Sequence, residues 1–301
     1  MSLEIGPSHL PHIKRVDLDE AGLEAFKTEE EFTGLGVDLM VETASYACVA
    51  ASLWGDESGW DRDHAAVAGN VVRLYKLLDG YLDQTCKRRE EISTILARLV
   101  FETAVNVRYL ISNFSKTLID SYVTYSLRPD RKLQKEVQAN IDARKGIMRP
   151  IEDRMLQSIN RLFKASEVDG EAVDANGERN WDGLSIFDRT REVGLESLYN
   201  AAFGLTSHSV HGNWAELYGS HLEWDEGHRF KPRLGWRNPR PQMTTAIAIV
   251  VLDTLSLYFE FVGGESAAEY FKPRLSDLSA RVRRLAEVHE IYLAGKTWPE
   301  I

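Results

Sequence analysis

The chain has 301 residues, of which 44% are hydrophobic and 27% are charged, and its formal net charge is -10. These proportions are typical of a globular protein with enough length for a large core, in one large domain or two small ones. The negative charge argues against binding of nucleic acid or anionic membranes by the whole surface, so any such role must come from a local patch.

Cysteine usage and hydropathy favour a cytoplasmic protein without a membrane partner. The two cysteines, Cys48 and Cys86, have no C-x-x-C spacing, so neither a disulfide framework nor a zinc ribbon is expected. The amino terminus lacks the basic segment and apolar run of a secretory signal. The most apolar run, residues 244–262, contains Asp253 and Glu260, which are costly at bilayer depth, so it predicts a buried core helix.

The first half of the chain predicts a surface arm followed by helices. Residues 1–33 contain two prolines and no sustained period, which is typical of an arm. Residues 37–54 are apolar nearly all round and indicate a central helix. Further helices are expected, from periodicity and from proline breaks, at residues 64–87, 90–113, 115–127, 131–145 and 147–164.

The second half predicts a long connection and then more helices. Residues 167–185 are acidic and aperiodic, and we expect an exposed loop between two halves of one fold. Residues 222–241 indicate a short hairpin or an ordered loop. Helices are expected at residues 188–203, 205–219, 244–262 and 275–293. The prediction is a mainly α fold, a compact bundle of about eight or nine helices with a small hairpin or irregular insertion, in one domain over residues 34–301.

The helix expected at residues 90–113 has two different faces when wound at 100° per residue. The face expected in the core holds Leu96, Leu99, Thr103, Val107, Leu110 and Ile111. The other holds Arg98, Glu102, Val105, Asn106, Tyr109 and Asn113, with Arg108 about 80° from Arg98. If that face is exposed, Arg98 and Glu102 form only a weak i, i+4 pair. If other helices cover it, its polar groups must satisfy one another or bind an anion.

Residues 203–214 read FGLTSHSVHGNW and concentrate polar groups in one short segment. On a helix Ser207 and His211 share a face, whereas His208 is displaced by about 100°. A nucleophile with its base is disfavoured, because a helix lacks the strained turn and oxyanion donors of acyl transfer. A metal shared with Glu102 or Glu216 lacks the H-E-x-x-H pattern, so no metal and no cofactor are expected. The plain alternative is a core histidine bonded to a carboxylate or carbonyl.

The favoured hypothesis joins these two segments in one polar pocket. Arg98 and Glu102 would face Ser207 and His211, in a pocket suited to a phosphate or a carboxylate. His211 would act as general acid or base, so these four residues are the candidate catalytic group. The flanking candidates for ligand contacts are Asn106, Arg108, Tyr109, His208 and Asn213.

The segments ARLVFETAVNVRYLISN, residues 97–113, and LTSHSVHGNW, residues 205–214, together resemble a helical bacterial family classed as a domain of unknown function. That family's pattern is an R-x-x-x-E-x-x-x-N helix and a later S-x-x-x-H-G. The resemblance covers residues 41–258 and implies a mainly α fold in a bacterial cytoplasm, with no established activity.

A looser analogy is to helical ribonuclease and nucleotide-binding domains of prokaryotic toxin and defence systems, in which four to six residues separate an Arg from a His. That spacing occurs at Arg284 and His289. Leu285 stands where a polar residue usually follows the Arg, and about one such match is expected by chance, so the motif is weak.

The segment GHRFKPRLGWRNPRP, residues 227–241, is basic, in contrast to the negative net charge of the whole chain. Its cations alternate with aromatic rings, which can grip phosphates and stack on bases. The candidate nucleic-acid contacts are Arg229, Lys231, Arg233, Trp236 and Arg237. The alternative is a loop that pairs with the protein's own acidic surface or with a second subunit.

Two functional hypotheses follow. The leading one is a cytoplasmic protein that binds, or as a hydrolase or ribonuclease cleaves, a phosphate-bearing ligand such as a nucleotide or RNA, with a defence or toxin-like role. The competing one is a non-catalytic interaction protein that forms a homo-oligomer, in which the same polar residues only lock helices together. A solvent-open cavity between Arg98 and His211 favours the first, and mutual salt bridges without a cavity favour the second.

Overall fold

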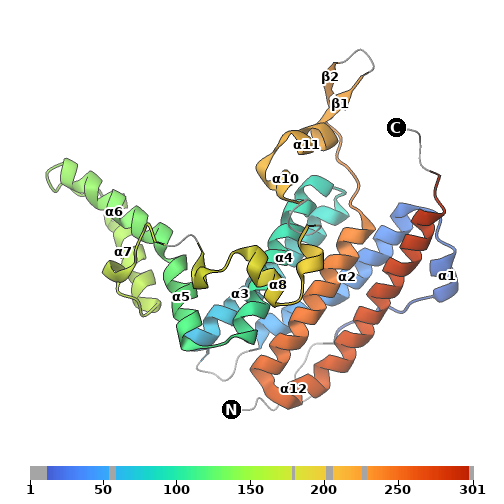
Figure 1. The fold of residues 1–301 in the computed structure, drawn as a ribbon, viewed down its shortest axis with the longest axis horizontal. Coiled ribbons are helices and arrows are strands. Elements are labelled where there is room, and N and C mark those ends of the chain that lie inside the picture. Colours follow the sequence, from blue (N-terminus) through green and yellow to red (C-terminus); the bar gives the residue numbers. More distant parts are fainter. Residues whose placement is uncertain (1–11, 54–58, 178–179, 201–205, 226–228, 298–301) are drawn as a thin grey trace.

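The computed structural model describes residues 12–53, 59–177, 180–200, 206–225 and 229–297. Within them the protein is mainly α, with eight helices of seven residues or more packed compactly and one two-stranded antiparallel hairpin. The predicted fold class is therefore confirmed. Figure 1 shows a central group of long helices from which two parts of the chain project.

Four long helices form the centre of the molecule. They are α2 (Glu29–Ser52), α3 (Arg62–Cys86), α4 (Glu90–Ser112) and α12 (Pro241–Ala294). Helix α12 reverses at Gly264, whose φ of 61° lies in the left-handed region, so its two halves run side by side in Figure 1. This turn falls between the two helices predicted at residues 244–262 and 275–293.

Local sequence explains where the central helices begin. Thr28 and Glu31 form a capping box at the start of α2, in which the Thr28 hydroxyl accepts from the Glu31 N–H. Asp61 accepts from the His64 N–H (2.9 Å) at the start of α3. One face of α3 is buried, through Val67, Val71, Leu74, Leu78 and Tyr81, and Leu77 is partly buried.

Helix α4 is buried on more sides than the two-faced helix that the sequence predicts. Thr103, Val107 and Leu110 are buried as expected, whereas Leu96, Leu99 and Ile111 are only partly buried. Val100 is buried within the arc of that face, and further buried residues lie outside it: Ala97, Phe101, Ala104 and Val105. The reason is that α3, α8, α10 and α12 all pack against α4, so small apolar residues are needed around most of its circumference.

The apolar first half of α12 is long and apolar enough, by length and composition alone, to cross a membrane. In the structure Ile247, Val251, Leu255 and Phe259 are buried in the same core as residues of α2 and α4. The half-helix thus packs as a core helix, as its two internal carboxylates predict.

One projecting part of the chain is a helical hairpin, which we call the arm. It consists of α6 (Arg128–Ala143) and α7 (Pro150–Ala165), reached through α5 (Lys116–Ser126). Lys145 and Gly146 both have positive φ in the tight turn between α6 and α7. The arm has a small hydrophobic cluster of its own: Leu127, Ile159, Phe163 and Val173.

The connection predicted as an exposed loop, residues 167–185, contains two short 3-10 helices, η2 (Gly170–Ala172) and η3 (Trp181–Gly183). Trp181 is buried, and its ring packs edge-on against Tyr109 and Tyr122. The connection therefore contributes to the core through one aromatic side chain. Helices α8 (Ile186–Glu192) and α9 (Glu196–Tyr199) follow, and residues 201–205 of the predicted helices lie outside the described residues.

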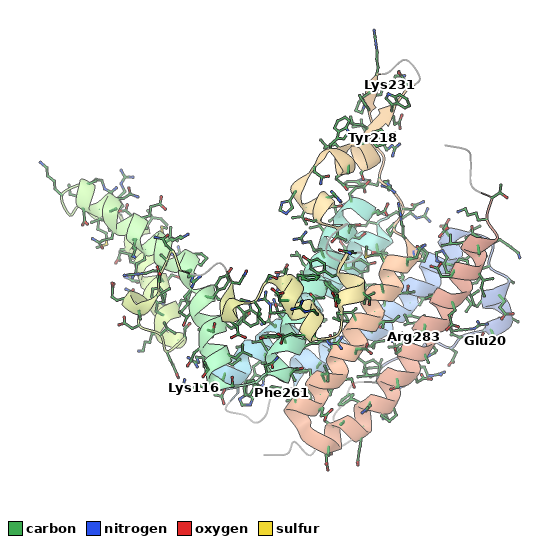
Figure 2. The ribbon with its side chains drawn as sticks, in the orientation of Figure 1. Glu20, Lys116, Tyr218, Lys231, Phe261 and Arg283 are labelled. Atoms are coloured by element: carbon green, nitrogen blue, oxygen red, sulfur yellow. The ribbon has the colours of Figure 1, made fainter. Side chains whose placement is uncertain are left out.

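The second projection carries the histidine segment and the hairpin. Its elements are α10 (Thr206–His211), α11 (Trp214–Glu216), the π-helical turn η5 (Leu217–His221), β1 (Leu222–Trp224) and β2 (Phe230–Pro232). In the hairpin Glu223 lies opposite Lys231. Figure 2 shows Tyr218 and Lys231 on this projection, away from the central helices.

The described part of the predicted N-terminal arm lies against the bundle. It includes the short helix α1 (Glu20–Glu24), whose Leu23 is buried, and the start of α2, whose Phe32 is fully buried. Residues 1–11 of that prediction lie outside the described residues. The chain before α2 is thus fixed by apolar contacts and by ion pairs to α12.

A buried bidentate ion pair joins α2 to the second half of α12. Arg281 Nη1 and Nη2 each donate to a carboxylate oxygen of Glu42 at 2.7 Å, and both side chains are almost fully buried. Arg281 also donates to Asp277 and to the carbonyl oxygen of Val16. The backbone N–H of Val16 in turn donates to Glu42 (2.8 Å). Burial lowers the pKa of Arg281, but the hydrogen bonds and charge of Glu42 outweigh it and raise that pKa overall.

We predict that Glu42→Ala lowers the free energy of unfolding by about 3–5 kcal/mol, because it leaves the Arg281 guanidinium buried without its main counter-charge. Chemical denaturation measures this loss. The double substitution Glu42→Leu with Arg281→Met is the matched control and should cost less, since no unpaired charge remains. A double variant less stable than Glu42→Ala contradicts this account.

Candidate functional site

A polar pocket forms where three segments that the sequence singles out come together. It has a volume of about 180 Å³ and opens to solvent between the start of α4, the α10 to η5 segment and the chain before α12. Its lining residues are Glu90, Glu91, Thr94, Thr206, Ser209, Glu216, Ser220, Arg237, Arg240 and Met243. Three carboxylates, two guanidinium groups and four hydroxyls therefore share one small space.

Glu90 binds both arginines of the pocket. Arg237 Nε lies 3.1 Å from one Glu90 carboxylate oxygen, and Arg240 Nε lies 3.0 Å from the other. The Glu90 N–H also donates to the Arg237 carbonyl oxygen (3.0 Å), which fixes the segment before α12 against the first turn of α4. Burial raises the pKa of Glu90 above its ordinary value, although the charges of Arg237 and Arg240 act in the opposite direction.

Glu91 has an unused acceptor at this site. Its side chain is 7% exposed, and the Arg237 N–H donates to its Oε1 (3.3 Å). Its Oε2 is buried and has no hydrogen-bond partner among the described residues. An unsatisfied buried polar atom costs about 1–3 kcal/mol, so a donor group of a ligand entering the pocket would recover that free energy.

The opposite wall is held by hydrogen bonds within the second projection. Ser209 Oγ donates to Glu216 Oε2 (2.9 Å), and His221 Nε2 lies 3.5 Å from Glu216 Oε1. Arg237 Nη1 donates to the Gly219 carbonyl oxygen and to Ser220 Oγ, both at 3.4 Å. Arg237 therefore links the two walls of the pocket.

A second cavity of about 290 Å³ adjoins the first and shares Glu90, Thr94, Arg240 and Met243 with it. Its other lining residues are Tyr81, Ser93, Pro239 and Gln242. Most of its accessible wall is apolar, as is most of the wall of the first cavity. The two cavities together place charged groups, hydroxyl groups and apolar surface side by side.

The candidate residues on α4 lie outside this pocket. Tyr109 is buried and donates to Asp182 (2.5 Å), which together with burial raises its pKa. Glu102 is half-buried, and its charge acts on Arg189 of α8, whose guanidinium stacks 4.1 Å from the centre of the Trp181 ring. Arg98 is half-buried on the same face. Tyr109 and Glu102 thus hold η3 and α8 on α4.

Asn106 and Arg108 contain buried polar atoms without hydrogen bonds. Within the part of the chain that the structure describes, Asn106 Oδ1 has no partner, nor do Nε and Nη1 of Arg108. Burial lowers the pKa of Arg108, and only the charge of Asp253 on α12 opposes this effect. Since the two residues are about 200° apart on the helix, they do not face a common ligand.

The candidates on α10 are more exposed than the sequence predicts. His211 is exposed, and in the described part of the chain no hydrogen bond or ion pair involves its side chain. The reason is that the helix ends there, since Gly212 has a φ of 58° and its N–H donates to the His208 carbonyl. His208 contacts the amide of Asn213, which itself caps α11. Ser207 is half-buried and makes no hydrogen bond with His211.

Most cations of the basic segment pair with neighbouring acids. Lys231 lies 3.6 Å from Asp225, and Arg233 lies 3.6 Å from Glu223. Trp236 lies beneath the guanidinium of Arg89, and Arg237 binds Glu90 as described above. Arg229 is exposed; its backbone N–H donates to Asp225 Oδ1 (3.1 Å) and its carbonyl oxygen accepts from the Asp225 N–H (3.0 Å). These contacts fit the alternative left open by the sequence, in which the basic segment pairs with the protein's own acidic residues.

Sequence reasoning misses the residues that line the pocket on the α4 side. Glu90, Glu91 and Arg240 are charged residues next to predicted helix ends, which is a common position for charge and so gives no specific signal. In the described ranges no three His, Cys, Asp or Glu side chains are grouped to hold a metal ion.

Comparison with known proteins gives one match. A family model described as a family of unknown function, DUF5677, matches residues 64–229. No curated protein and no solved structure matches the chain. The matched stretch contains α4, the arm, α10 and the first strand of the hairpin.

We predict that Arg240→Ala raises the pKa of Glu90 further, because it removes one of the two cations that oppose the effect of burial. Carbon-detected NMR titration of the glutamate carboxyl groups measures this shift, and Arg283→Ala on α12 should leave it unchanged. Because the folded state holds this proton more tightly than the unfolded state, the stability gained from Glu90 is lost as pH rises through its folded-state pKa. A lower pKa in Arg240→Ala contradicts this account.

Proposed function

The chain belongs to the DUF5677 family, whose function is unknown, and we propose from the geometry of the site that the protein binds a nucleotide in the pocket beside Glu90. The sugar lies in this pocket, the phosphate at its mouth, and the base in the adjoining cavity. The proposal is for binding, with a nucleotide as the phosphate-bearing ligand.

The observation that carries the proposal is the Glu91 carboxylate, which lines the pocket together with four hydroxyl groups and whose Oε2 accepts no hydrogen bond from the described residues. A carboxylate in a pocket wall pairs with a ligand that brings N–H or O–H donors, as the hydroxyls of a ribose do. The lining hydroxyls of Thr94, Thr206 and Ser220 can donate or accept, so they suit the remaining sugar oxygens.

The charges of the pocket favour a phosphate at its mouth and not at its base. Three carboxylates and two guanidinium groups leave the lining with a formal charge of -1, which repels an anion from the interior. The Arg240 side chain is 62% exposed, with its Nε 3.0 Å from Glu90, so its guanidinium is accessible to a ligand at the mouth of the pocket. A phosphate there meets a guanidinium in high dielectric, where repulsion from the carboxylates is weakest.

The adjoining cavity suits the base of the nucleotide. Its wall contains Tyr81, Pro239 and Met243, which offer apolar and polarisable surface to an aromatic ring. Hydrolysis is not part of this proposal, because His211, the expected general base, is exposed and does not line either cavity.

We predict that adenosine monophosphate stabilises the protein in a thermal-shift titration, and that Glu91→Gln weakens its binding about tenfold or more. Glutamine keeps the size of the side chain but supplies one acceptor fewer, so a ligand donor loses its charged partner. Arg240→Ala should weaken binding of the monophosphate but not of adenosine. Glu223→Gln, which removes one carboxylate from the hairpin, is the control. Equal binding of adenosine monophosphate by the wild type and the three variants would contradict the proposal.

A second candidate function, self-association, is favoured by exposed aromatic residues on the second projection. The rings of Trp214, Tyr218 and Phe230 contact one another edge-on or tilted, yet all three side chains are exposed. Trp224, Leu234 and Trp236 add further exposed apolar surface nearby in the chain. Aromatic surface of this kind is typical of protein interfaces, because rings bury large area with little loss of side-chain entropy.

We predict a concentration-dependent dimer or larger oligomer in analytical ultracentrifugation, which Trp214→Ser with Phe230→Ser shifts to the monomer. The matched control is Ile151→Ser, which removes an exposed apolar side chain from the arm and should leave the distribution unchanged. A wild-type protein that is monomeric at every concentration rules out this second function.

A further inference from the structure

The arm carries a charge opposite to that of the rest of the molecule. Residues 128–165 contain ten Lys and Arg against five Asp and Glu, a net charge of +5, although the whole chain carries -10. The remaining residues therefore carry -15. Such segregation of charge concentrates positive potential on one projecting element while the body repels the same partners.

Most of the arm's cations are exposed and form no close ion pair with a described residue. Arg131 pairs with Glu171, and Arg144 pairs with Glu152. Within the described residues no ion pair engages seven exposed cations: Lys132, Lys135, Lys145, Arg149, Arg154, Arg161 and Lys164.

These cations point away from the buried side of each helix. On α6 the buried positions Val137 and Ile141 lie about 140–180° from Lys132. On α7 the buried positions Ile159 and Phe163 lie about 140–180° from Arg154, and Arg161 shares the Arg154 face at i, i+7. The basic side chains thus line the outward faces of a hairpin that stands free of the bundle (Figure 1).

We propose that the arm binds the phosphate backbone of a single-stranded nucleic acid. This surface is separate from the pocket beside Glu90, so the proposal does not depend on nucleotide binding there. A flexible polyanion can follow the outward faces of both helices and neutralise cations along their whole length, with release of its condensed counterions.

An anionic membrane is the other polyanion that such a surface could meet, because Ile147, Met148 and Ile151 are exposed near the turn of the arm. A membrane that touches this tip reaches Lys145, Arg149 and Arg154 only. Four of the seven cations lie toward the opposite end of helices that are about 24 Å long, beyond the Debye length of about 8 Å. Their placement favours a partner that lies along the arm.

Fluorescence anisotropy with a labelled 25-nucleotide single-stranded RNA tests the proposal on the full chain. The arm variant replaces Lys132, Lys135, Arg161 and Lys164 with Ala, which leaves the buried side of each helix intact. We expect it to lose about tenfold or more in affinity at low salt. The slope of log K against log salt should become less steep by about 3 units, at about 0.7 per phosphate contact on a single strand.

The matched control removes the same charge from the body, through Lys27, Lys76, Lys272 and Arg283, all exposed and replaced with Ala. It should bind RNA like the wild type, and Figure 2 shows Arg283 on α12, away from the arm. The same strand as DNA shows whether the sugar matters, and either sugar is compatible with backbone binding.

Three results would overturn the proposal. They are no binding of either strand by the wild type, equal losses in the arm and control variants, and arm-dependent binding of phosphatidylserine vesicles without binding of nucleic acid. Circular dichroism of the arm variant guards against loss of the hairpin, and adenosine monophosphate binding by that variant reports separately on the pocket.

Discussion

The bidentate pair between Glu42 and Arg281 is the contact on which the arrangement of the bundle depends. It lies where α2, the second half of α12 and the chain around Val16 meet, and each partner satisfies the other's buried charge. A buried pair of this kind adds little net stability compared with apolar packing, but it tolerates only one relative position of the two helices. With α2 and α12 fixed in register, the chain before α12 has a fixed path across α4.

The path of the chain before α12 across α4 forms one wall of the pocket. The Glu90 and Glu91 side chains at the start of α4 hold the segment around Arg237, and Arg237 in turn holds the π-helical turn η5. Carboxylates at a helix start are favourable there because of the helix dipole. The same acids that stabilise the first turn of α4 therefore also recruit two arginines and leave one acceptor, Oε2 of Glu91, without a partner among the described residues.

The fold could be predicted from sequence more completely than the candidate site. Helical periodicity locates α3, α4, α6 and α7 because burial on one side leaves a 3.6-residue pattern. The pattern does not say which helices pack on the polar side of α4, so the half-buried state of Arg98 and Glu102 could not be derived. Gly212 could be seen as a permissive residue, but not as the end of α10 that leaves His211 exposed. The net charge of residues 128–165 can be counted from the sequence. Only the structure shows that these residues form a projecting hairpin with its cations on the outward faces.

The small hydrophobic cluster of the arm has a mechanical consequence. Because Leu127, Ile159, Phe163 and Val173 form a cluster separate from that of the bundle, the length of α6 and α7 is not constrained by packing in the bundle. Seven residues added to each helix would extend the hairpin by about 10 Å and bring the exposed face back to nearly the same orientation. The arm is thus a spacer whose reach can change through insertions while the bundle and the pocket stay the same.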